Sequence, residues 1–256
     1  MIALFLRTWG GAFRDAARLV RALPLLVAVM VGLELAQHAV ELRVGFFSPD
    51  RAVHAAAADH PLRLALGWPK MIALSLVAFA ATRRLLAGEA PLRPAAEAMR
   101  RHYLWVMALE LIPAAIIIHA PAIAAALGVG AGAVLPLRVT TGLALQLAEP
   151  ALFLWFANAA AGSGGVGPVA SAQATRWLYP WALLLMLAAR LPLAQLHGRL
   201  NLWAVGQTTA TQWGLLALDA LVVGILALVV PAAQLRAARV IAARRARPLL
   251  VDAPAT

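Results

Sequence analysis

The chain contains no cysteine, and only 13% of its 256 residues are charged. The absence of cysteine excludes disulfide bonds and zinc sites built from thiolates. A water-soluble domain is about 45–50% apolar and about 25% charged, whereas 63% of this chain is hydrophobic. The composition therefore excludes a disordered chain and disfavours a soluble globular domain.

Long apolar runs, separated by segments that carry arginine, make up most of the sequence. Each run is long enough to cross the roughly 30 Å of hydrocarbon in a bilayer as a helix. The sequence therefore predicts an all-α fold, a polytopic membrane bundle of six transmembrane helices with cytoplasmic interfacial amphipathic helices. The predicted spans are 23–42, 64–82, 103–120, 135–157, 177–196 and 213–231.

Arginine is distributed unequally between the two sides of these spans. Fifteen arginines fall on the side of the N-terminus and five on the opposite side, which is a strong positive-inside signal. We therefore expect a multi-pass protein of a bacterial inner membrane with both termini in the cytoplasm. Its formal net charge of +11 then belongs to the cytoplasmic face, so nucleic-acid binding is not needed to explain the charge.

The two ends of the chain are predicted to lie at the cytoplasmic surface. Residues 1–22 alternate apolar and basic side chains, as an interfacial amphipathic helix does. Residues 23–231 form the transmembrane domain, and residues 232–256 form a basic cytoplasmic tail. Because 232–247 carries five arginines, we expect the tail to rest on anionic lipid headgroups.

Alanine-rich segments at 94–102 and 168–176 precede the third and fifth spans with similar spacing, which suggests repeated units; chance likeness is the alternative. With its amphipathic lead-in at Phe13–Leu23 and a lead-in helix from Pro168 to Trp177, the layout resembles uncharacterised six-span bacterial inner-membrane proteins. It also resembles the membrane domain attached to some glycerophosphodiester phosphodiesterases. The resemblance implies a membrane protein of unassigned activity and carries over no functional residue.

Every predicted span contains an ionisable residue. On insertion scales such a group costs roughly 2.5–3.5 kcal/mol when it faces lipid near the centre of a helix. These side chains should therefore face one another, in a polar core that leans toward the outer side. The candidates for binding a substrate or a proton are Glu34, Lys70, Glu110, Glu149, Arg190 and Asp219.

Lys70 is the only lysine of the chain, and a desolvated lysine, unlike arginine, can lose its proton. It is predicted to pair with Glu34, which lies at a similar depth; the alternative is an ammonium group that contacts a substrate. Glu110 and Glu149 lie nearest the middle of the bilayer. With Glu41 and Arg138 counted outside the membrane, the spans hold four acids and two bases. We therefore expect at least one of these two carboxyl groups to exchange a proton or bind a cation. Permanent protonation and packing is the alternative.

Glu34, His38 and Glu41 lie on one face of the first predicted span, at spacings of four and three residues. A divalent metal ion accepts such imidazole and carboxylate ligands. A hydrated polar lining that pairs with Lys70 or outer arginines is the alternative. The stripe lacks the His-Glu-x-x-His pattern of zinc peptidases, and no nucleophile has an evident base partner. We therefore expect no catalytic residue and no cofactor.

Three functional classes remain open. A non-catalytic membrane partner or lipid-organising protein is preferred, a small permease that uses buried acids is the alternative, and an intramembrane enzyme comes third. The expected partners are the lipid bilayer, anionic headgroups at the cytoplasmic face, and a second protein or a second copy of the chain. A cavity around the acids favours transport, whereas complete pairing of the charges favours a scaffold.

Overall fold

The computed structural model describes residues 1–87, 92–246 and 248–250. Every regular element within these ranges is a helix, and six helical segments are long and apolar enough to cross a membrane. The prediction of an all-α six-helix bundle is therefore confirmed. The six segments are Pro24–Val44, Pro61–Leu86, Ala95–Ile118, Ala131–Ala161, Pro168–Ala204 and Thr209–Arg244.

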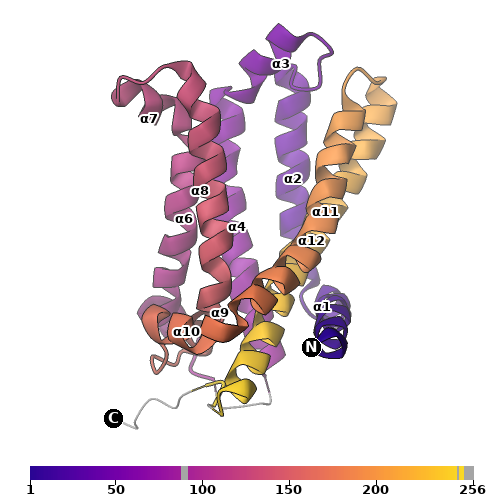
Figure 1. The fold of residues 1–256 in the computed structure, drawn as a ribbon. Helices are drawn as coiled ribbons and strands as arrows, with labels where there is room; N and C mark the ends of the chain where they lie inside the picture. The colour runs from indigo at the N-terminus through magenta and orange to yellow at the C-terminus, as the bar shows by residue number, and fades with distance from the viewer. Residues whose placement is uncertain (88–91, 247, 251–256) are drawn as a thin grey trace.

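Several of these spans combine an α-helix with short 3-10 or π turns (Figure 1). The helices of the first half are α1 (Ile2–Ala22), α2 (Pro24–Val44), α3 (Arg51–Ala58), α4 (Pro61–Leu86), α5 (Ala95–Ala98), η1 (Met99–Tyr103), α6 (Leu104–Ile118) and α7 (Ala120–Ala126). Those of the second half are η2 (Ala131–Ala133), α8 (Val134–Ala148), η3 (Glu149–Leu152), α9 (Phe153–Ala161), α10 (Pro168–Thr175), η4 (Arg176–Leu178), α11 (Tyr179–Ala204) and α12 (Thr209–Arg244).

Local sequence explains where several helices begin and break. Pro24 and Pro61 occupy the first turns of α2 and α4, where the missing N–H has no intrahelical partner to lose. The carboxylate of Asp50 caps α3 by accepting a hydrogen bond from the Ala52 amide at 2.8 Å. Pro150 lies in the 3-10 turn η3, which divides the fourth span into α8 and α9, whereas α6 continues through Pro113.

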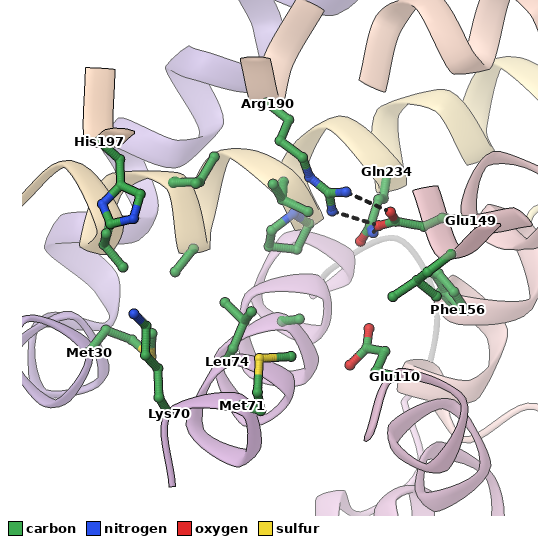
Figure 2. Close-up of a pocket in the computed structure, with 17 residues that line it drawn as sticks. Met30, Lys70, Met71, Leu74, Glu110, Glu149, Phe156, Arg190, His197 and Gln234 are labelled. Atoms are coloured by element: carbon green, nitrogen blue, oxygen red, sulfur yellow. Dashed lines mark hydrogen bonds and ion pairs between the residues drawn. The ribbon is translucent and has the colours of Figure 1, made fainter. Parts of the chain in front are cut away.

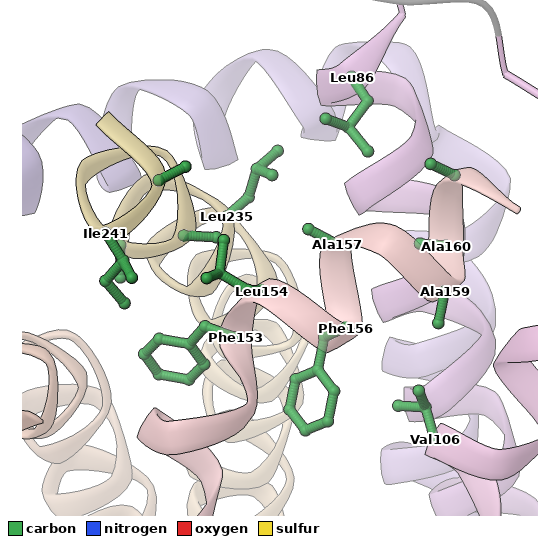
Figure 3. Packing of buried hydrophobic residues seen from close by; sticks show 14 of the residues in the cluster. Leu86, Val106, Phe153, Leu154, Phe156, Ala157, Ala159, Ala160, Leu235 and Ile241 are labelled. Atoms are coloured by element: carbon green, nitrogen blue, oxygen red, sulfur yellow. The ribbon is translucent and has the colours of Figure 1, made fainter. Parts of the chain in front are cut away.

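Helix α12 is the centre of the bundle. In its most apolar stretch 61% of the residues are buried, against 22–28% in the other spans. It contacts α1, α2, α4, α9 and α11. Figure 1 shows α6 and α8 beside α4 on one side, and α2, α11 and α12 on the other. At one end of the bundle, Phe153 and Leu154 of α9 pack near Leu235 and Ile241 of α12 in an apolar cluster (Figure 3).

Helix α1 packs against α12 at this end of the bundle. Helices α3 and α7 lie at the opposite end (Figure 1). The Asp15 carboxylate accepts a hydrogen bond from Nε of Arg236 at 2.6 Å. A Cβ atom on Gly11 would lie 2.3 Å from Nη1 of Arg236, so glycine leaves room for the guanidinium group beside α1. The expected helix over 1–22 is present. One of its faces packs against the rest of the bundle and the other is exposed.

The predicted tail begins inside α12, because that helix continues without a break to Arg244. Arg236 pairs with Asp15, Arg239 donates to the carbonyl of Leu85 at 2.9 Å, and Arg245 donates to the carbonyl of Ala174 at 2.8 Å. Arg247 and residues 251–256 lie outside the described residues. These three arginines satisfy protein oxygens, and contact of the tail with lipid headgroups stays a prediction.

The segments with similar spacing at 94–102 and 168–176 both form short helices. Helix α5 is followed by the π turn η1 before α6, and α10 is followed by the 3-10 turn η4 before α11. Each segment thus forms a lead-in helix joined to a span through a turn that is not α-helical. The two turns differ in type, and the expected repeat of three such units, with Phe13–Arg21 in the first, stays a prediction.

Candidate functional site

A cavity of about 310 Å³ lies between the two groups of helices, and residues from all six spans line it (Figure 2). Its wall is mostly apolar, with side chains such as Met30, Met71 and Leu226. Four of the six residues predicted to bind a substrate or proton also lie on this wall. They are Lys70, Glu110, Glu149 and Arg190.

Glu149 is buried and fully paired. The Arg190 guanidinium contacts both of its carboxylate oxygens, at 3.0 and 3.1 Å, and the Gln234 amide donates to Oε1 at 2.5 Å (Figure 2). A two-pronged contact of this kind is the strongest geometry for an arginine–carboxylate pair. Of the two acids predicted to be available for proton exchange, Glu149 is therefore engaged as one partner of an ion pair.

Glu110 differs from Glu149 in its surroundings, although both line the cavity. Its Oε2 accepts a hydrogen bond from the Ser75 hydroxyl at 2.5 Å. Among the described residues, no lysine, arginine or histidine forms an ion pair with it. The expectation that one mid-membrane carboxyl lacks a basic partner therefore applies to Glu110.

Lys70 and Glu34 form an ion pair between α4 and α2, which confirms the predicted contact. The Lys70 ammonium also donates to Oε1 of Gln37 at 3.3 Å. Glu34 lies behind the cavity wall with 1% of its surface exposed, while the Lys70 side chain is 22% exposed. Lys70 thus joins the cavity to a buried polar network between α2 and α12.

That buried network is organised around the imidazole of His38. Nδ1 of His38 contacts Oε2 of Glu41 at 2.9 Å, and Nε2 contacts Oδ2 of Asp219 at 2.9 Å. Asp219 is completely buried. It also contacts Nδ1 of His197 at 2.7 Å and accepts from the Asn201 amide at 2.8 Å. Helices α2, α11 and α12 are therefore joined at this level by charged and polar groups.

His197 and Asn201 did not emerge from the sequence as site residues. They are four residues apart on α11, so they lie on one helix face. That spacing, opposite a predicted intramembrane acid, is the signal that could have identified them. His197 also lines the cavity, so it connects the network to the apolar space.

The group of possible metal ligands in the structure differs from the predicted stripe, because Asp219 takes the place of Glu41. Oε1 of Glu41 accepts hydrogen bonds from Arg63 at 2.8 Å and from Gln37 at 2.9 Å. Glu41 thus lies on the Nδ1 side of the His38 ring, whereas Glu34 lies on the Nε2 side. The residues whose ligand atoms come together, within 4.8 Å of one another, are Glu34, His38 and Asp219.

The structure therefore shows features of both arrangements considered above, a cavity beside the acids and pairing of the charges. Three of the four predicted intramembrane acids are paired with basic side chains, and the charged groups nevertheless border one cavity. Comparison of the chain with protein-family models, with curated proteins and with solved structures found no match.

Proposed function

We propose that this chain is a non-catalytic membrane protein that binds a lipid-like amphipathic molecule in its central cavity. The observation that carries the proposal is a mostly apolar space of about 310 Å³ among six membrane-type helices, with charged groups at its wall. Small-molecule pockets have volumes of about 300–1,000 Å³ and are lined mainly by apolar side chains with a few polar groups. The hydrocarbon part of an amphiphile fits such a wall.

The charged groups at the wall indicate which kind of head group the bound amphiphile carries, namely one that both donates and accepts hydrogen bonds. Lys70 and Arg190 are cationic, and Glu110 and Glu149 are acidic, so the wall carries both signs. The side chains of Lys70 and Arg190 are 22% and 23% exposed. A zwitterionic head group therefore suits this wall better than a strongly anionic one.

A small permease is the second candidate, and Glu110 favours it. A half-buried carboxyl without a basic partner at the wall of a cavity is the kind of group through which membrane carriers couple protons to a substrate. In that case the same cavity binds the transported molecule. Binding of an amphiphile without movement across the membrane distinguishes a lipid-organising protein from a permease.

Filling the cavity should weaken lipid binding. In Leu226→Trp the larger ring enters the cavity, and in Leu221→Trp it enters the surrounding lipid, since Leu221 lies on the exposed face of α12. We expect a radiolabelled single-chain phosphocholine lipid to bind Leu226→Trp at least about tenfold more weakly than the parent, a loss of roughly 1.4 kcal/mol. Leu221→Trp should bind as the parent does. Equal affinity of all three proteins contradicts the proposal.

We also propose that the protein lies in a bacterial inner membrane with both termini in the cytoplasm. The fifteen-to-five distribution of arginines supports this orientation. Reporter fusions at Asp59 and at Thr256 should report opposite compartments, and the same compartment for both contradicts the proposal.

We propose that the exposed face of α1, away from the bundle, contacts anionic lipid headgroups. Its arginines at positions 7, 14, 18 and 21 are exposed, while Ala12, Ala16 and Leu19 are buried against the bundle. A helix with one basic and one apolar face suits the membrane interface. A protein partner or a second copy of the chain is the alternative occupant of this surface.

A further inference from the structure

Three buried side chains with ligand atoms for a metal ion meet on the outer side of the cavity. Glu34 and His38 come from α2, and Asp219 comes from α12. They are 1%, 1% and 0% exposed, and one ligand atom of each lies within 4.8 Å of the others. This group is separate from the cavity wall, where none of the three is found.

Both nitrogens of the His38 ring face carboxylates. Nδ1 lies 2.9 Å from Glu41, and Nε2 lies 2.9 Å from Asp219 and 3.7 Å from Glu34. A neutral imidazole carries one proton, so one of its nitrogens presents a lone pair to a carboxylate. That repulsion is relieved if the ring is doubly protonated or if a cation lies between Nε2 and the two acids.

Glu34 supplies an independent observation. Its Oε2 is paired with the Lys70 ammonium, whereas its Oε1 is buried and accepts no hydrogen bond. Nε2 of His38 lies 3.7 Å from Oε1, which is longer than a hydrogen bond. A buried carboxylate oxygen without a donor is costly, and this one points toward the other two ligand atoms.

We propose that Glu34, His38 and Asp219 bind a first-row divalent cation such as Zn²⁺. With metal–ligand bonds of about 2.0–2.1 Å, the ligand atoms of a tetrahedral site are about 3.3 Å apart. The Nε2–Asp219 and Nε2–Glu34 distances of 2.9 and 3.7 Å lie on either side of this value. Those two distances therefore need to change by about 0.4 Å on binding, while the ligand atoms of Glu34 and Asp219 start within 4.8 Å of each other.

The residues around the three ligands already form the outer shell that such a site requires. Metal-binding histidines usually donate their other ring N–H to a carboxylate, which fixes the tautomer, and Glu41 lies at that position. His197 and Asn201 hold Asp219 from its other sides. The formal charges nearby are three carboxylates, Lys70 and Arg63, so with His38 and His197 neutral the network carries a net charge of −1, which favours binding of a cation.

The site is tested with the full chain in detergent, stripped of metal by a chelator and titrated with Co²⁺. We expect one Co²⁺ per chain, with visible absorption bands typical of a tetrahedral ion, and displacement by Zn²⁺. His38→Gln and Asp219→Asn should each weaken binding at least about 100-fold. Glu41→Gln, which leaves all three ligands in place, should weaken it about 10–100-fold. The control His119→Gln, which alters a histidine beside Trp68, should bind as the parent does.

Two results overturn this inference. One is a parent protein that binds no Co²⁺, and nitrogen NMR of His38 then shows whether a second ring proton takes the place of the cation. The other is undiminished Co²⁺ binding by His38→Gln, or by Glu41→Gln if His38→Gln does not fold. The site does not depend on the lipid cavity, because none of its three ligands lines that cavity.

Discussion

Replacing Arg190 by leucine is expected to destabilise the protein by about 3–5 kcal/mol, because it leaves a buried carboxylate without its cation. Arg190 contacts both oxygens of Glu149, and the remaining partner, Gln234, is uncharged. The pair also joins α11 to the turn η3. Its loss should therefore loosen the side of the bundle where the fourth and fifth spans meet.

Thermal unfolding in detergent measures this effect. The double variant Arg190→Leu with Glu149→Leu should recover more than half of the loss, because neither charge is then left unpaired in the apolar wall. Arg199→Leu removes an exposed arginine from the same helix and should change stability little. A double variant no more stable than Arg190→Leu contradicts the role assigned to the pair.

Lys70→Met is expected to cause a second large loss, also about 3–5 kcal/mol, since Glu34 then stays buried without the ammonium group that pairs with it. Lys70→Met combined with Glu34→Leu should restore much of the folded yield. The comparison belongs in chelator-treated protein, so that a metal ion on Glu34 does not contribute. The yield of monodisperse protein after purification is the simplest readout.

The matched control for this pair is Lys70→Arg, which keeps the charge at the wall of the cavity but changes the shape of the head group. It should lie between the parent and Lys70→Met. If the double variant is no better than the worse single variant, the Glu34–Lys70 contact does not stabilise the fold.

Depth along the bilayer explains what the sequence could predict. The long apolar runs define the six spans, and charged residues can be placed at a depth by counting from the span ends. Glu34 and Lys70 fall at similar depths on consecutive spans, and α2 and α4 are neighbours, so this pair was predictable. The cap at Asp50 was predictable as well, because it depends on a few adjacent residues.

The features that the sequence did not predict depend on the rotation of each helix about its axis and on contacts between helices far apart in the chain. The side of the His38 ring that faces Asp219 depends on how α2 and α12, far apart in the chain, are turned toward each other. The stripe on one helix therefore suggested Glu41 as a ligand, although Arg63 and Gln37 bind that residue. The arginines of the predicted tail pose the same difficulty, because positive charge at a helix end suits lipid headgroups and protein carbonyls equally.

Photolabelling in native membranes tests most directly the claim that the cavity binds a lipid chain. A single-chain phosphocholine lipid with a diazirine on its chain should label Met71, Leu74 and Leu226, which line the cavity. An excess of the unlabelled lipid should remove this labelling, because the cavity holds a limited number of molecules. Labelling confined to bilayer-facing residues such as Leu221, and insensitive to competition, contradicts the claim.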